Sequence, residues 1–167
     1  MDAYMLRSMI RTCSYNPLHI RSVRNTITRE LLERSNGGNQ MDSEMFPLDL
    51  ISFAEKSGIA DIRILDFIDV DTVTCVPEWV LKALLKDCNT MLEYTPFDLV
   101  TIHDSFGALP CNMNTVRYWY NEMLARVAES NVTQWILRQL YNDDELVFTK
   151  DSEGLAEYIR QADYTLC

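Results

Sequence analysis

The residues with the clearest chemical potential are His103 and Asp104, in the stretch "TIHDSFGALP". They follow the apolar run "FDLV", which is typical of a short strand, and they precede Gly107 and a proline, which favour a turn. A carboxylate at the end of a strand is held rigidly, as Mg²⁺ requires, because that ion takes oxygen ligands in strict geometry from only one or two carboxylates. The alternative is an ordinary polar turn, in which Asp104 and Ser105 bind nearby backbone amides. Spacing alone leaves both interpretations open.

The segments that must position this motif are predicted to be mostly helical. Apolar residues recur at helical spacing in "NTITRELLER", "FPLDLISFAEK" and "PEWVLKALLKDCNTMLEY", and Pro77 suits the first position of the last of these helices. Two further helices are expected in "NTVRYWYNEMLARVAE" and "NVTQWILRQLY". Their apolar stripes are predicted to face the core; they consist of Val116, Tyr120, Met123, Leu124 and Val127, and of Val132, Trp135, Ile136 and Leu140.

Two segments carry a strand pattern. In "DIRILDFIDV" the side chains alternate along residues 62–67, which predicts a strand with a buried face. A proline at 96 ends the preceding helix before the strand "FDLVTI". We therefore expect an α+β fold, in which a small antiparallel hairpin around Val100 to Leu109 packs on several α-helices.

Charge is distributed unevenly along the chain. The 167 residues carry a net charge of −10, but residues 1–34 hold six Arg against three acids. We divide the chain at the loop "SNGGNQ" into a basic, partly helical segment, 1–40, and a larger portion, 41–167. The basic segment either contacts phosphates or presents a solvated helix face. The acidic remainder is poorly suited to binding nucleic acid by itself.

Several classes of protein are disfavoured by composition. No apolar run is long enough to span a membrane, so no membrane partner is expected. The five scattered Cys indicate reduced thiols in a cytosolic compartment rather than a disulfide framework or a metal knuckle. His19 has no acid or Cys nearby in sequence and is interpreted as structural.

The string "FDLVTIHDSFGALP" resembles the third palm motif of the single-subunit, phage-type RNA polymerases, the family that includes mitochondrial RNA polymerase. There, a strand leads into His-Asp-Ser-Phe-Gly, and all five positions match here, from His103 to Gly107. The family then has two helices, a short final helix and a C-terminal tail. The end of this sequence, "EGLAEYIRQADYTLC", has Asp163 and Tyr164 in the matching places of that tail. The resemblance covers residues 96–167 and is weaker over 52–95.

This resemblance implies a specific chemistry. Family members copy a DNA template into RNA, and two Mg²⁺ ions held by two aspartates stabilise the attacking and leaving oxygens as a nucleoside triphosphate is consumed. Asp104 would be one of those aspartates, and His103 would help to orient it. Ser105 and Gly107 would shape the hairpin turn. The C-terminal tail would fold back and bring the carboxylate of Cys167 near the metal ions.

Other parts of the family pattern are absent from the sequence. We find no second palm aspartate followed by Gly, no Tyr-Gly pair and no Lys before Lys56. In "DFIDVDTV", Asp69 and Asp71 stand without the expected His. The sequence thus predicts one half of an active site, namely the C-terminal palm subunit of a split phage polymerase. One or more partner chains would supply the second aspartate, the fingers and most of the positive charge.

Two alternatives remain open at this point. One is a catalytically inactive regulator or decoy that binds a polymerase; the other is a palm fragment of a family A DNA polymerase, in which Glu usually follows His-Asp. Ser105 favours the RNA polymerase, and the intact motif argues against a decoy. The resemblance also implies a location in the cytoplasm of an infected bacterium or in the virion.

Overall fold

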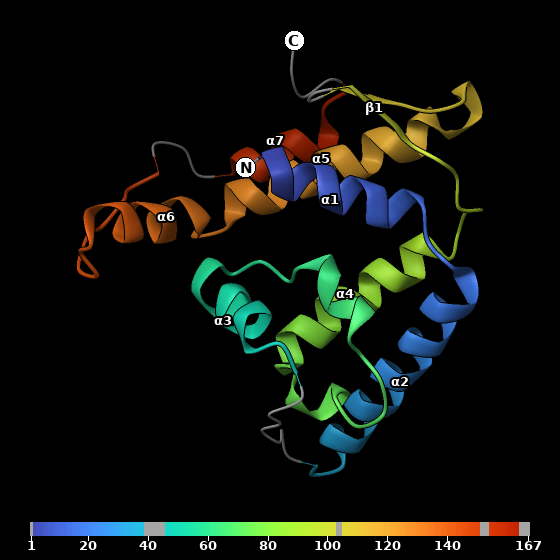
Figure 1. Ribbon diagram of the computed structural model, residues 1–167, viewed down its shortest axis with the longest axis horizontal. Helices are drawn as coiled ribbons and strands as arrows, with labels where there is room; N and C mark the ends of the chain where they lie inside the picture. The colour runs from blue at the N-terminus through green and yellow to red at the C-terminus, as the bar shows by residue number, and fades with distance from the viewer. Residues whose placement is uncertain (1, 39–45, 103–104, 151–153, 164–167) are drawn as a thin grey trace.

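The computed structural model describes residues 2–38, 46–102, 105–150 and 154–163. Two groups of helices are stacked (Figure 1). One contains α2 (Pro17–Ser35), α3 (Leu48–Ser57) and α4 (Glu78–Met91), with the 3₁₀ turns η1 (Ile62–Asp66) and η2 (Val73–Cys75). The other contains α1 (Asp2–Cys13), α5 (Met113–Glu129) and α7 (Leu155–Gln161). α6 (Val132–Tyr141) projects to one side, near α3.

The strands form a single small hairpin among the described residues. β1 (Val100–Ile102) pairs antiparallel with β2 (Ser105–Gly107), and the turn η3 (Pro110–Asn112) leads from β2 into α5. The expected α+β fold, a small antiparallel hairpin packed on helices, is confirmed. Within the described residues, no helix is both long and apolar enough to cross a membrane.

Local sequence signals explain where several helices begin and end. α2 begins after Asn16, whose side chain accepts a hydrogen bond from the Leu18 amide at 2.9 Å, and Pro17 occupies the first helical position. α3 ends at Gly58, which adopts the left-handed conformation that favours glycine, with φ of 75°. We expected Pro77 at the first position of α4. It instead directly precedes the helix, which begins at Glu78.

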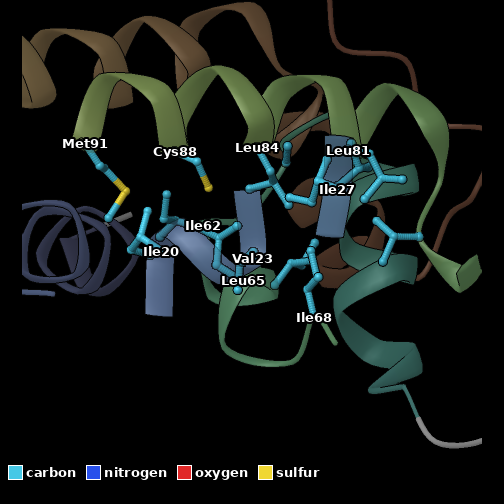
Figure 2. Packing of buried hydrophobic residues seen from close by; sticks show 14 of the residues in the cluster. Ile20, Val23, Ile27, Ile62, Leu65, Ile68, Leu81, Leu84, Cys88 and Met91 are labelled. Carbon is cyan, nitrogen blue, oxygen red and sulfur yellow. The ribbon is translucent and has the colours of Figure 1, made fainter. Parts of the chain in front are cut away.

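The main core lies between α2, α4 and η1. In Figure 2, Leu81, Leu84, Cys88 and Met91 of α4 point toward Ile20, Val23 and Ile27 of α2, and Ile62, Leu65 and Ile68 pack among them. All of these side chains are buried. The stripe predicted for the long helix is thus largely correct: Val80, Leu84, Cys88 and Met91 are buried, Ala83 and Leu92 are partly buried, and the fully buried Leu81 was not predicted.

The predicted strand at 62–67 is wrong. Residues 62–66 form η1, and Asp61 starts this turn by accepting a hydrogen bond from the Arg63 amide at 2.8 Å. Ile62, Ile64 and Leu65 are all buried, so burial in this segment is not confined to alternate positions, as a strand with one buried face would require. The same sequence also satisfies an alternating pattern, so periodicity alone selected the wrong element.

The predicted burial of α6 is only partly correct. Val132 is buried, but Leu140 is 74% exposed and Trp135 is only half-buried, against Phe53 of α3 with ring centroids 5.5 Å apart. α6 therefore covers the body at one end only. In α5, by contrast, the core side chains include Trp119, fully buried and outside the stripe that we predicted.

One arginine of the basic segment has a structural role. Arg34 of α2 is buried, forms an ion pair with Glu30 at 2.7 Å and donates hydrogen bonds to the carbonyls of Thr74 and Val76 at 2.9 and 3.0 Å. These contacts tie the end of α2 to the segment before α4. Arg34 is therefore neither on a solvated helix face nor free to bind a phosphate.

Candidate functional site

The hairpin register fixes the position of the motif in the chain. Val100 pairs with Gly107, Thr101 with Phe106, and Ile102 with Ser105. His103 and Asp104 are thus the two residues that connect the paired strands, and they lie outside the described residues. Ser105 and Gly107, expected to shape the turn, are the first and last residues of β2.

One face of the hairpin packs on α5. Phe106 is half-buried, and its ring lies 5.8 Å from that of Tyr120 in α5. Thr101, the cross-strand partner of Phe106, is on the same face because directly opposed side chains of an antiparallel pair point to the same side. α5 therefore serves as the platform that orients the strands on either side of His103 and Asp104.

The segment that enters β1 is anchored to the end of α1. The amide of Phe97 donates a hydrogen bond to the Cys13 carbonyl at 2.8 Å, and the hydroxyl of Tyr94 donates to the Thr12 carbonyl at 2.5 Å. The indole of Trp119 in α5 donates to the same hydroxyl at 2.6 Å. Burial raises the pKa of Tyr94, so this hydroxyl keeps its proton. The entrance to the hairpin is thereby fixed by both α1 and α5.

The chain that follows α7 also returns to α5. The side-chain amide of Asn121 donates to the Ala162 carbonyl at 2.8 Å, and Arg117 lies 3.7 Å from the carboxylate of Asp163. These α5 residues flank Tyr120, which contacts the hairpin. Of the predicted tail residues, Asp163 is thus near the hairpin platform, whereas Tyr164 and Cys167 lie outside the described residues.

A buried ion network joins α4, α5 and α7. Arg126 of α5 forms a bidentate pair with Asp87 of α4, at 2.8 and 2.5 Å, and contacts Glu122 at 3.0 Å. Arg160 of α7 contacts Glu122 at 2.8 Å and forms a second bidentate pair with Glu129, at 2.5 and 2.9 Å. Glu122 therefore links the two arginines and fixes α7 against α5.

The two glutamates have lowered pKa values. Burial would raise the pKa of Glu122, but the hydrogen bond from Arg160 and the charge of Arg126 outweigh burial, so its pKa lies below the ordinary value of 4.5. The hydrogen bond from Arg160 likewise lowers the pKa of Glu129. Both carboxylates are thus ionised at neutral pH.

This network predicts an acid sensitivity of the α5–α7 contact. A carboxyl group whose pKa is lowered by folding stabilises the folded state above its unfolded pKa, and that contribution disappears as the pH falls through the folded value. We expect the pairs of Arg160 with Glu122 and Glu129 to contribute constantly near neutral pH and to weaken below about pH 4.5. Urea unfolding from pH 7 to pH 3 should show a shallower decline for Arg160→Gln than for the unaltered chain. Parallel declines would contradict this prediction.

A cleft of about 280 Å³ adjoins the network. Its lining includes Trp79, Lys86 and Asn131 as well as the two network arginines, Arg126 and Arg160. Both arginines are already paired with carboxylates, so neither is free to bind an anion in the cleft. Sequence analysis missed this region, since only the four-residue spacing of Glu122 and Arg126 hinted at an ion pair.

Of the two histidines, only His19 lies within the described residues. The Nε2 atom of His19 lies 3.2 Å from the Leu65 carbonyl, which supports a structural role. His103 lies outside the described residues. In the described part of the chain, no three His, Cys, Asp or Glu side chains are grouped so that they could hold a metal ion. A carboxylate such as Asp104 suits Mg²⁺, but one carboxylate does not complete a two-ion site.

Comparison of the sequence with protein-family models and with curated proteins gives no match.

Proposed function

We propose that this chain is the C-terminal catalytic-palm subunit of a split, phage-type DNA-directed RNA polymerase. The observation that carries the proposal is the two-residue connection between β1 and β2. The motif string His-Asp-Ser-Phe-Gly runs from that connection through β2, and pairing of Ile102 with Ser105 brackets its His-Asp pair. A polar turn with no catalytic role would not require this five-residue match.

In the proposed enzyme, Asp104 binds the catalytic Mg²⁺ ions together with a carboxylate from a partner chain. Those ions stabilise the attacking and leaving oxygens of nucleotidyl transfer. His103 orients the Asp104 carboxylate, and the DNA template, the RNA and the nucleoside triphosphate bind across both chains. The structural contribution of this chain is to hold the hairpin rigidly, through the Phe106–Tyr120 contact and the anchoring of Phe97.

The position of Asp163 supports the proposed role of the tail. Asn121 and Arg117 bind the chain at Ala162 and Asp163, on the helix that also carries the hairpin. The described chain thus returns to α5 before residue 164. We propose that Tyr164 packs toward the hairpin and that the carboxylate of Cys167 lies near the metal ions.

The charge of the chain supports a divided enzyme. With a net charge of −10, the chain offers few cations for the phosphates of a template and a transcript. Arg126 and Arg160 are already engaged in ion pairs, and Arg34 is buried. The partner chain would therefore provide most of the contacts to nucleic acid.

The direct test compares the purified chain with a reconstituted complex. We expect no primer extension from the isolated chain on a DNA template with Mg²⁺, because a single carboxylate does not hold two ions. Addition of a chain that carries an Asp-Gly palm motif and a Tyr-Gly fingers motif should produce template-dependent RNA. Synthesis by the isolated chain would exclude a split enzyme, and a complex of the two chains without activity would favour the regulator.

A further inference from the structure

The hairpin has a second face, opposite α5, that carries exposed apolar side chains. Val100 and Ile102 are 62% and 66% exposed, and they point to the same side because side chains alternate along a strand. Across the hairpin they face Gly107 and Ser105, which are too small to cover them. We call these four residues the outward face. An isolated two-stranded hairpin is marginally stable in water, so such a face is normally covered.

Gly107 is not explained by its surroundings in this chain. Its φ is not in the left-handed region, in contrast to Gly37, Gly58 and Gly154. Among the described residues, a Cβ atom at 107 would meet Val100 alone, at 3.9 and 4.0 Å, which are ordinary contact distances. Glycine weakens a strand, and within a strand it often marks a place where another backbone approaches closely. Gly107 therefore indicates close approach by a backbone that does not belong to the described residues.

The charges around the hairpin restrict what can approach it. Between Lys86 and Arg117 the sequence has no Lys or Arg, whereas Glu93 and Asp98 are exposed acids. These acids disfavour direct contact of nucleic acid or anionic lipid with the outward face itself. A second copy of the chain would bring the same acids opposite one another. A different polypeptide with basic flanks matches both the charge and the apolar side chains.

We infer that the outward face, formed by Val100, Ile102, Ser105 and Gly107, binds an apolar segment of a different polypeptide whose flanks carry Lys or Arg. The backbone of that segment lies closest at Gly107, and its side chains cover Val100 and Ile102. This inference rests on the proposed function for the identity of the polypeptide, which is the chain that supplies the second palm aspartate.

Site-specific cross-linking identifies the occupant directly. Ile102 is replaced by the photo-cross-linking residue p-benzoylphenylalanine in the full chain, in the cells where the chain is naturally made. Mass spectrometry then identifies the linked peptide. The same replacement at Leu140, which is 74% exposed on α6, is the matched control. We expect one basic polypeptide to be linked from 102 and not from 140. Cross-links to this chain's own residues 164–167, to a second copy or to nucleic acid, or no cross-link, would overturn the inference.

Two substitutions then measure the interface with the identified chain. Gly107→Val should lower its affinity about tenfold or more, because the new side chain occupies the place of the approaching backbone. The melting temperature of the free chain should not fall, since valine favours strands and finds space at this position. Ile102→Thr should also weaken binding without altering the melting temperature, whereas Leu140→Thr should change neither. Unchanged affinity in both hairpin variants would overturn the inference.

The cross-linking and activity results separate the two proposals. A basic polypeptide linked at 102 that supports no RNA synthesis would exclude the polymerase and leave the interface standing. An active complex in which Gly107→Val and Ile102→Thr bind with full affinity would support the polymerase and exclude the outward face as the interface.

Discussion

Asp104→Asn is expected to abolish RNA synthesis by the reconstituted complex, with a loss of several orders of magnitude in rate. Asparagine has nearly the same shape as aspartate but lacks the negative charge that binds Mg²⁺. The ions stabilise both the attacking and the leaving oxygens, so their loss affects the chemical step itself. The measurement is single-turnover extension of an RNA primer on a DNA template, with saturating nucleoside triphosphate.

The matched control is Asp144→Asn, which removes the same charge from an exposed acid after α6, away from the hairpin in sequence. This variant should extend the primer at nearly the unaltered rate. Both variants should assemble with the partner chain, as judged by size-exclusion chromatography. Comparable turnover by Asp104→Asn and the unaltered complex would remove Asp104 from the chemistry and favour the regulator.

Arg126→Met is expected to lower the free energy of unfolding by about 3–5 kcal/mol. The side chain of Asp87 is only 2% exposed and forms its two short hydrogen bonds with Arg126. Removal of the arginine leaves a buried carboxylate without its counter-ion, which costs much more than the ion pair itself contributes. Urea unfolding at pH 7, followed by circular dichroism, measures the change.

Two comparisons show whether burial is the cause. Lys82→Met breaks the exposed pair with Glu78, in which the side chains are 65% and 52% exposed, and should leave stability nearly unchanged because solvent screens this pair. The double substitution Asp87→Leu and Arg126→Met removes both charges and should be more stable than Arg126→Met alone. Equal instability of the single and double variants would mean that packing, rather than the uncompensated charge, governs this position.

Local signals in the sequence located the helices unevenly. The apolar stripe of α4 has one dominant period and was predicted. We predicted α2 only over residues 25–34, although Asn16 and Pro17 mark its start, and we did not predict α1. The 3₁₀ turn at residues 62–66 was not predicted, because their apolar side chains also fit the alternating pattern of a strand. The local signal for the turn is Asp61, which caps it. Burial of α6 depends on how far it extends from α3, which no local pattern encodes.

The candidate site likewise has parts that the sequence could predict and parts that it could not. The hairpin could be predicted because the strand, the connection and the second strand are contiguous from Val100 to Gly107. The ion network could not, since Asp87, Glu122 and Arg160 come from three separate helices. The outward face could be recognised only from the strand register of the structure. The pairing of Val100 with Gly107 shows that a small residue lies opposite an exposed apolar one.

The packing of α1 on α5 has a consequence for synthesis of the protein. Tyr4 of α1 and Met123 of α5, whose hydroxyl and sulfur lie 3.8 Å apart, are separated by 119 positions in the chain. A ribosome needs on the order of ten seconds to translate that interval. During this time the buried side chains of α1, Met9 and Cys13 among them, have no α5 to pack against. The nascent chain therefore exposes an apolar helix face for that period, which is the kind of surface that chaperones bind.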